Sequence, residues 1–299
     1  MRTPNFIIMG FPKCGTTSLH HYLEEHPNIF MPNQKELHYF TSKKLAKLNN
    51  GPGDKIVKQT QIKSFSKYLS FFKNVNDQIA VGEASPSYIN YPEFFPEIKK
   101  TLNDPKVIII IRDPINRAYS NYMHLKRESR EILSFKESLF AEEKRKKLGF
   151  SDFWYYKFNS TYFDKIKKAQ NIFSKVLVLT LEDLNQNPKE TIKVVYSFLG
   201  VNQNHKIRNL GKRYNLGGNY SSNIITRALF KPSKTKNILK KFFKPTSKIK
   251  VFLAFLSKHF LKPTKEIDLE TVSLLRKHFK NDVRKIQKMN INIKNWREY

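Results

Sequence analysis

Short runs of apolar residues alternate with segments of helical spacing through the first two thirds of the chain. Four of these runs, at 5–9, 79–83, 107–111 and 176–179, are predicted to be buried strands. The third run is Val followed by four Ile, and such an unbroken β-branched segment is typical of a strand covered on both faces. The pattern therefore predicts a sheet at the centre of the fold.

Helices are predicted between and after these strands, at about 16–25, 115–127, 135–147, 161–173 and 188–199. Gly200 follows the last of them, where a helix commonly ends on a left-handed glycine. Helical spacing also occurs from Phe65 to Phe72, within a polar, Lys-rich segment. Strands that alternate with helices predict an α/β fold, with a central parallel sheet flanked by helices.

The pattern changes after residue 210. Residues 211–223 hold three Gly with several Asn and Ser and predict a loop, while 231–262 carry ten Lys interleaved with apolar residues. A last amphipathic helix is predicted at about 269–288, with Trp296 beyond it. We expect one domain over 1–299, with its core at about 5–202 and a basic helical C-terminal elaboration at about 225–299.

Composition adds a charge argument to this pattern. The 55 Lys and Arg outnumber the 25 Asp and Glu, and the formal net charge of +30 favours anionic partners without specifying which. The basic segment 231–262 fits two interpretations: contact with an anionic membrane or acidic substrate, or a helical hairpin whose aromatic side chains pack on the sheet. The sequence predicts no oligomeric state.

Cysteine usage and hydropathy bear on location. Cys14 is the single cysteine, so no disulfide can form within the chain and an oxidising compartment gains no support. The first apolar run is too short for the apolar segment of a signal peptide, and no later run reaches the roughly 18 residues of a membrane span. We therefore predict a cytoplasmic protein.

The first predicted strand runs into a P-loop-like phosphate-binding turn. The sequence from 10 to 17 is Gly-Phe-Pro-Lys-Cys-Gly-Thr-Thr. Backbone N–H groups at a helix start, together with the helix dipole, attract an anion. The glycines let the backbone approach a phosphate, Thr16 and Thr17 add hydroxyl donors, and Lys13 adds a point charge. Thr16 and Thr17 would also suit capping of the helix.

This turn departs from the nucleotide-triphosphatase pattern G-x-x-x-x-G-K-[ST]. Thr16 stands in the place of the Lys, which lies at position 13, and the Ile-rich strand ends in Arg112 rather than in a metal-binding Asp. An ATP-dependent phosphoryl transferase is disfavoured but stays as one alternative. A nucleic-acid-binding protein, suggested by charge alone, is the other, although we expect no nucleic-acid partner. No cluster of metal-ligating residues is visible in the sequence.

Two motifs carry a resemblance to a known family. Residues 12–19, Pro-Lys-Cys-Gly-Thr-Thr-Ser-Leu, resemble the 5′-phosphosulfate-binding loop of sulfotransferases. Residues 111–114, Ile-Arg-Asp-Pro, with 117–120, Arg-Ala-Tyr-Ser, resemble the 3′-phosphate-binding motif of the same family. Residues 35–40 and 82–88 are similar to segments of its carbohydrate-directed branch, and the resemblance covers about 5–202.

The resemblance implies an enzyme that uses 3′-phosphoadenosine 5′-phosphosulfate (PAPS) and releases adenosine 3′,5′-bisphosphate (PAP). Lys13 would stabilise the departing phosphate. Arg112 and Ser120 would bind the 3′-phosphate, although Arg112 could instead pair with Asp113, and Ser120 could be an ordinary helix-face residue. The residues that the resemblance implies for the 5′ end are Lys13, Cys14, Gly15, Thr16, Thr17 and Ser18.

The family segment at 35–40 implies that Glu36 is the catalytic base, which takes the proton of an acceptor hydroxyl. His38 is the alternative base, because other branches of the family use His, and in a strand it would share a face with Glu36. Glu36 could also form only a surface ion pair with a Lys. The implied acceptor is a glycan or glycolipid, but Ala84 stands where heparan-modifying members usually have a Lys, which argues against a heparan-like acceptor.

Cys14 allows a separate prediction. A thiol beside a helix N-terminus and a Lys is expected to have a lowered pKa and to react with alkylating reagents, unless it is buried. We expect alkylation of Cys14 to inactivate the enzyme and PAP to protect it.

Overall fold

The computed structural model describes residues 2–57, 61–212, 219–220, 261–262 and 266–299. Most of the basic segment 231–262 lies outside these residues, so both interpretations of it stay predictions. Among the described helices, none combines the length and the apolar character needed to cross a membrane.

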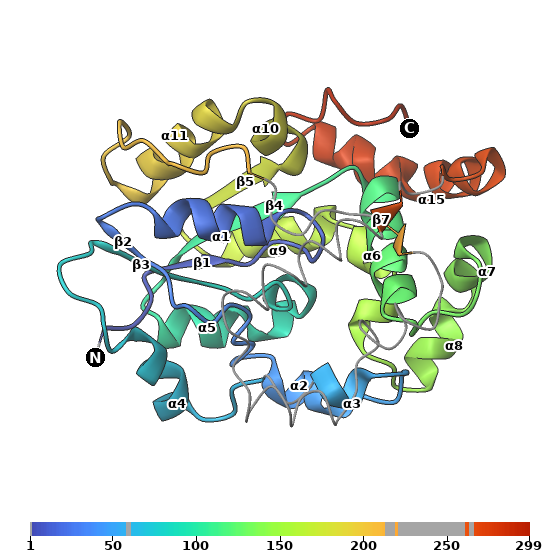
Figure 1. Cartoon of the computed structure of the whole chain (residues 1–299), viewed down its shortest axis with the longest axis horizontal. Helices are drawn as coiled ribbons and strands as arrows, with labels where there is room; N and C mark the ends of the chain where they lie inside the picture. Colours follow the sequence, from blue (N-terminus) through green and yellow to red (C-terminus); the bar gives the residue numbers. More distant parts are fainter. Residues whose placement is uncertain (1, 58–60, 213–218, 221–260, 263–265) are drawn as a thin grey trace.

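A five-stranded parallel sheet lies at the centre of the molecule, as predicted (Figure 1). Its strands are β1 (Phe6–Ile8), β2 (Ile29–Phe30), β3 (Ala80–Ala84), β4 (Lys106–Ile111) and β5 (Val176–Thr180). Their order is β2-β3-β1-β4-β5, and β1 pairs with both β3 and β4. Residues 107–111 of β4 are fully buried, which confirms the strand covered on both faces. The sequence did not predict the two-residue edge strand β2.

Helices cover both faces of this sheet. The connection from β1 to β2 contains α1 (Thr16–Glu24), that from β3 to β4 contains α5 (Phe95–Thr101), and α9 (Phe163–Ile172) precedes β5. Parallel crossovers are right-handed, so connections that run in opposite directions along the sheet lie on opposite faces. Figure 1 accordingly shows α1 and α5 on opposite sides of the sheet, and α9 contacts α5.

The remaining elements include helices at 42–47, 54–57 and 181–186 that were not predicted, and they differ from the predicted ranges in two further places. Their helices are α2 (Ser42–Lys47), α3 (Asp54–Val57), α4 (Phe65–Leu69), α6 (Pro114–Arg127), α7 (Phe135–Phe140), α8 (Glu142–Lys147), α10 (Leu181–Gln186), α11 (Pro188–Leu199) and α15 (Leu269–Gln287), with short 3₁₀ turns such as η2 (Ser70–Phe72). Gly200, at φ 81°, ends α11 as predicted. The helix predicted at 135–147 is divided at Ala141, which ends α7 and begins α8. Part of the loop predicted at 211–223 is instead a strand, β6 (Asn219–Tyr220), which pairs antiparallel with β7 (Leu261–Lys262).

The strand order determines where a ligand can bind. All five strands are parallel, so their carboxyl ends lie at one edge of the sheet. The chain leaves β1 toward β2 and leaves β4 toward β5, in opposite directions, which makes the space between β1 and β4 a topological switch point. Ligands of open α/β sheets bind in this crevice. The two predicted phosphate-binding motifs follow β1 and β4, and they therefore flank it.

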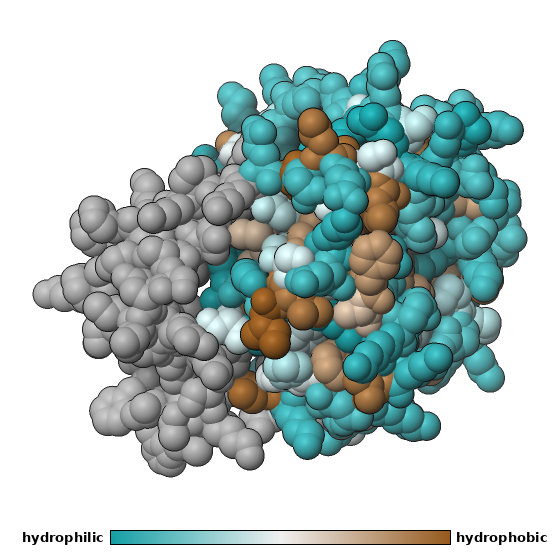
Figure 2. Space-filling model, turned by 90° about the vertical axis from the view of Figure 1, so that its right-hand side faces the viewer, coloured by the Kyte–Doolittle hydropathy of each residue, from teal (hydrophilic) through white to brown (hydrophobic). Residues whose placement is uncertain are grey.

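The side of the molecule that carries α7, α8 and α15 is mostly hydrophilic, with hydrophobic residues between the polar ones (Figure 2). Ile132, Phe140 and Leu269 are among the exposed apolar side chains of the chain, at 85%, 63% and 86%. Individually exposed apolar residues are common on soluble domains. Nothing in the described part of the chain identifies a partner for them.

Candidate active site

Glycine shapes both ends of the loop after β1. A Cβ atom on Gly10 would lie 2.1 Å from the backbone nitrogen of Ile110, so only glycine lets the loop leave β1 against β4. Gly15 precedes α1 in the left-handed conformation, at φ 93°. Thr16 and Thr17 are the first two residues of α1, and the cap position belongs to Gly15. The positive end of this helix is thereby placed at the carboxyl edge of the sheet, where it favours an anion.

Lys13 is held in this loop without a partner of its own. Its amino group forms no hydrogen bond or ion pair within the described residues, and its backbone is left-handed, at φ 70°. Burial, together with the charges of Arg127, Arg117 and Arg112, lowers the pKa of Lys13 to about 8. The loop therefore lies in a region with an excess of positive charge, which an anionic ligand would neutralise.

The two motifs contact each other. Arg112 Nη1 donates to the backbone oxygen of Lys13 at 3.5 Å, across 99 residues of sequence. Arg112 does not pair with Asp113, the alternative left open by the sequence. Asp113 instead caps α6, accepting from the backbone nitrogen of Asn116 at 2.8 Å. The guanidinium of Arg112 is thus available for a phosphate.

The end of the chain supports the Arg112–Asp113 turn. The hydroxyl of Tyr299 donates to Asp113 Oδ2 at 3.0 Å. Trp296 Nε1 donates to Glu182 Oε2 at 3.1 Å, and Glu182 Oε1 accepts from the backbone nitrogen of Asp113 at 3.1 Å. These contacts fix the direction in which β4 passes into α6. They explain why Trp296 is buried near the end of a largely polar segment.

One face of α6 extends the positive region. Ser120 is half-buried there, and its hydroxyl has no hydrogen-bond partner in the described part of the chain. Arg127 lies seven residues later, on the same face of the helix, and its charge acts on Lys13. Arg127 was not predicted from the sequence. Its spacing of seven residues from Ser120, which places both on one face of a helix, could have indicated it.

Arg117 is a fully buried cation whose hydrogen bonds all go to uncharged groups. Its Nε donates to the backbone oxygen of Pro12 at 3.0 Å. Its Nη1 donates to the oxygen of Tyr156 at 3.2 Å and to Ser160 Oγ at 3.3 Å, and its Nη2 donates to Asn121. An unpaired buried charge is costly. Arg117 therefore fixes the carbonyl that precedes Lys13 and adds positive charge behind the loop.

We expect Arg117→Met to weaken PAP binding about tenfold, because Pro12 loses its donor and the loop loses a charge. The same change removes a cation that lowers the pKa of Lys13, so the loss of PAP affinity with rising pH should begin at a higher pH than in the wild type. Calorimetric titration with PAP between pH 7 and pH 10 measures both effects. Arg117→Lys, which keeps the charge, should retain the wild-type pH profile; equal profiles for all three proteins would contradict this role.

The Glu36–His38 segment is not the strand on which the shared face was predicted. Both residues are left-handed, at φ 62° and 51°, and the segment is held by the end of β3. The backbone nitrogen of Glu36 donates to Ala84 O at 2.9 Å, and that of His38 donates to Ser85 Oγ at 3.0 Å. The Ser85 hydroxyl thus accepts the hydrogen bond that a backbone carbonyl oxygen would accept between two regular strands. The two side chains still come together, with His38 Nε2 3.8 Å from Glu36 Oε2.

The buried carboxylate of Glu83 holds the Glu36–His38 segment in place through Ser85. Glu83 is fully buried on β3 and accepts hydrogen bonds from Ser85 at 2.7 Å, Tyr68 at 2.8 Å and Tyr88 at 2.9 Å. Burial raises the pKa of Glu83, although its three hydroxyl donors oppose the shift. Because Ser85 Oγ both donates to Glu83 and accepts from His38, Glu83 orients the segment that carries Glu36.

Backbone strain coincides with the predicted catalytic residues. Seven described non-glycine residues have a positive φ, and four of them, including His38, are Asn, Asp or His, the types most often found there. The other three are Lys13, Glu36 and Ser129. Unfavourable backbone conformations persist where the surrounding structure holds them, and they cluster at functional sites.

Glu36 is ionised in this setting. Its side chain is 47% exposed and forms an ion pair with Lys35. Desolvation by its surroundings opposes ionisation, but the hydrogen bond with His38 and the charge of Lys35 outweigh it and hold the pKa of Glu36 well below its usual range. An ionised carboxylate that is open to solvent and acts electrostatically on Lys13 can accept a proton beside the positive region.

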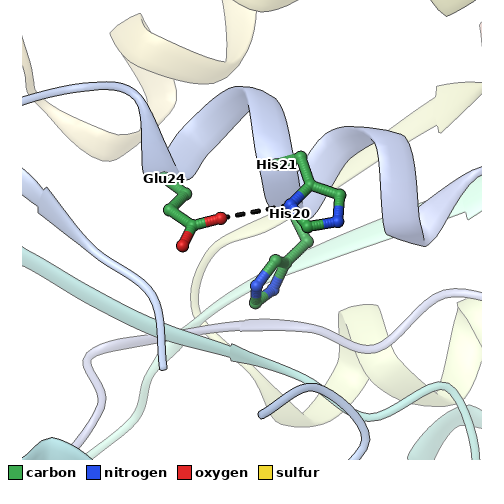
Figure 3. A group of neighbouring side chains, drawn as sticks. All are labelled: His20, His21 and Glu24. Atoms are coloured by element: carbon green, nitrogen blue, oxygen red, sulfur yellow. Dashed lines mark hydrogen bonds and ion pairs between the residues drawn. The ribbon is translucent and has the colours of Figure 1, made fainter. Parts of the chain in front are cut away.

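A second group of polar side chains lies on α1 (Figure 3). His21 Nδ1 lies 3.1 Å from Glu24 Oε2, whereas the ring of His20 is buried and its Nδ1 has no hydrogen-bond partner. Burial, together with the charge of Lys35, lowers the pKa of His20 to about 4. The same positive charge disfavours a metal ion beside His20, so we assign no metal site to this group.

The reactivity predicted for Cys14 is wrong. Its side chain is fully buried, and burial raises the pKa of the thiol to about 12, although the charges of Arg117 and Arg112 act in the opposite direction. The side chain points into the core rather than toward the helix start. We now expect Cys14 to resist iodoacetamide at pH 8 in the folded protein and to react only after denaturation, as mass spectrometry would show. Rapid labelling of the native protein would contradict this burial.

Known proteins are similar to this chain in sequence and fold. A family model described as "Sulfotransferase family" matches residues 4–205. The crystal structure of a sulfotransferase from Alicyclobacillus acidocaldarius is similar with a TM-score of 0.68 and 33% identity, over 77% of this chain and 90% of that one.

Two curated relatives match shorter stretches. Membrane-associated sulfotransferase kil1 of Dictyostelium discoideum is 37% identical over 119 residues, which is 40% of this chain and 22% of that protein. Carbohydrate sulfotransferase 15 of Mus musculus is 27% identical over 166 residues, or 46% of this chain and 30% of that protein. The chain thus spans less than a third of the length of these relatives. The family model and the bacterial structure, which each match more than two thirds of the chain, show that it belongs to the sulfotransferase family.

Proposed function

We propose that this sulfotransferase takes the sulfonyl group from PAPS and transfers it to a hydroxyl of a carbohydrate or glycolipid. The 5′-phosphosulfate would lie against Gly15 to Ser18 at the start of α1, next to Lys13. The 3′-phosphate would lie between Arg112 and Ser120. The observation that supports this best is the contact of the two motifs across the switch point, with a lysine and a serine hydroxyl on its two sides that have no partner among the described residues.

The chemistry needs one base and one stabilised leaving group. The acceptor oxygen attacks sulfur, and its proton passes to the carboxylate of Glu36. The bond between sulfur and the bridging oxygen breaks, and its electron pair stays on the 5′-phosphate of PAP. Lys13 compensates the charge that develops there. Arg117 and Arg127 add fixed positive charge near Lys13. The products of the transfer are a sulfate ester and PAP.

Glu36 fits the role of base better than His38. The Nδ1 atom of His38 is engaged with Ser87 Oγ at 2.7 Å, and its Nε2 is directed at Glu36. His38 is thereby suited to orient the carboxylate, and Glu36 has the more open side chain of the two. The carbohydrate-directed relatives favour a glycan acceptor for this chain.

Calorimetry with PAP tests the donor. We expect the purified protein to bind PAP at micromolar or lower concentration and to bind adenosine 5′-phosphate and ATP at least tenfold more weakly, since neither carries a 3′-phosphate. Arg112→Ala and Ser120→Ala should each reduce this preference. Equal affinity for ATP, with turnover of ATP in the presence of magnesium, would instead support the phosphoryl transferase.

A further inference from the structure

Three side chains at the end of α6 form a connected group. The Nη2 atom of Arg127 lies 3.3 Å from His124 Nδ1. The other ring nitrogen of His124, Nε2, lies 3.3 Å from Glu128 Oε1. All three side chains are half-buried. His124 thus lies between a guanidinium on one side of its ring and a carboxylate on the other.

This arrangement determines the protonation of His124. A guanidinium can only donate hydrogen bonds, so Nδ1 must accept and carries no proton. The proton of the neutral ring is then on Nε2, which faces Glu128. Burial lowers the pKa of His124, although its contact with Glu128 opposes the shift, and the charges of Lys13 and Arg127 act in the same direction as burial. The ordinary pKa of His is about 6.5, so the ring is neutral at pH 7 and above.

A turn that lies far from α6 in the sequence fixes Glu128. Arg130 donates to Glu128 Oε2 at 3.1 Å and to the buried carboxylate of Asp54. Asp54 also accepts from Trp154 Nε1 at 3.0 Å. A Cβ atom on Gly53 would lie 2.9 Å from Arg130 Nε, so the glycine leaves room for the arginine. The carboxylate that faces His124 is therefore held by groups outside the helix.

Arg127 is the neighbouring charge that acts most strongly on Lys13. Its effect on the pKa of Lys13 exceeds those of Arg117 and Arg112. An arginine side chain has several rotatable bonds, so the groups that receive its guanidinium decide where its charge lies. A neutral imidazole suits this purpose because it accepts from Arg127 without neutralising it.

We propose that His124 is a positioning residue, which holds Arg127 near Lys13 by accepting a hydrogen bond at Nδ1. The consequence for catalysis rests on the proposed function, since Arg127 there adds to the charge that stabilises the departing phosphate. His124 takes no proton from the acceptor in this scheme, and Glu36 stays the candidate base.

The pH dependence of PAP binding between pH 7 and pH 10 tests this role, because wild-type His124 stays neutral throughout this range. His124→Leu removes the acceptor, and we expect PAP affinity at pH 7 to fall about tenfold. A displaced Arg127 no longer lowers the pKa of Lys13, so the loss of affinity with rising pH should begin about half a pH unit higher. Asn carries an amide oxygen on Cγ, where His carries Nδ1. His124→Asn should therefore retain the wild-type affinity and pH profile.

A double variant distinguishes positioning from a general effect on the fold. In the Arg127→Met background, His124→Leu should change PAP affinity by less than about twofold, because no guanidinium remains to be held. The matched control is His278→Leu, which replaces an exposed histidine on α15 and should behave like the wild type. Equal losses in both backgrounds, an unchanged pH profile in His124→Leu, or the same loss in His124→Asn would each overturn the proposal.

Nuclear magnetic resonance of isotope-labelled histidine tests the proposal without PAP. At pH 8 we expect His124 to carry its proton on Nε2, and its Nδ1 resonance should move in Arg127→Met but not in His278→Leu. His124→Asn identifies the resonances of this ring by their loss. A proton on Nδ1 of the wild type would overturn the proposal. If the wild type fails to bind PAP, the donor assignment falls, while this spectrum still decides whether His124 holds Arg127.

Discussion

Replacing Glu36 with Gln is expected to lower kcat by about 10²- to 10⁴-fold. The amide keeps the shape of the side chain but cannot take the proton of the acceptor hydroxyl. The pKa of Glu36 lies well below its usual range, so its carboxylate stays ionised at mildly acid pH. Protonation of Glu36 should therefore not limit kcat between pH 5 and pH 8. Steady-state kinetics with labelled PAPS and a glycan acceptor would measure kcat of the variant and the dependence of the wild-type kcat on pH.

His38 provides the control for this substitution. His38→Ala removes the imidazole that lies 3.8 Å from Glu36 but leaves the carboxylate in place, and we expect a loss of about tenfold in kcat. PAP affinity should stay within twofold of the wild type in both variants, because neither residue is assigned to the donor. A larger loss in His38→Ala than in Glu36→Gln would transfer the role of base to His38.

Replacing Lys13 with Ala should lower kcat/KM by about 10²- to 10³-fold, because the departing phosphate loses a charge placed beside it. PAP binding should weaken as well. Lys43→Ala, on the exposed face of α2, controls for the loss of one surface lysine and should leave both quantities unchanged. If Lys13→Ala retains more than a tenth of the wild-type kcat/KM, Lys13 does not stabilise the leaving group.

The pH dependence of PAP binding provides a second test of Lys13. Its pKa is lowered to about 8, first by burial and then by neighbouring arginines. Below this pH the amino group is charged and contributes to anion binding; above it, the free protein must take up a proton to bind. PAP affinity should therefore fall as pH rises above about 8, and this fall should be absent in Lys13→Ala.

Local patterns in the sequence were sufficient for most of the fold. The run of β-branched residues at 107–111 predicted the buried central strand. Successive side chains of a strand point to opposite faces, so an unbroken apolar run indicates that both faces are covered. The glycines of the loop after β1 marked positions where the backbone passes close to another strand or turns left-handed. Strand β2 was missed because two residues carry no periodicity.

The candidate site could be predicted only in part. The meeting of Lys13 and Arg112 was predictable, since both follow strands of one parallel sheet. The conformation of Glu36 and His38 was not, because it depends on Ala84, Ser85 and Ser87, nearly fifty residues away. The error at Cys14 has the same origin: a neighbouring lysine and helix start suggested a reactive thiol, but burial outweighs both.

The sequence by itself determined the α/β fold, the order of its main strands along the chain and the two turns that are predicted to bind phosphate, because each depends on residues that are neighbours in the chain. The tertiary structure alone decided which charges converge on Lys13, how β3 holds Glu36, and that Arg117 is buried without a carboxylate partner. Electrostatic interactions and burial depend on distance in space, and folding brings together groups that the sequence separates by 47 to 105 residues.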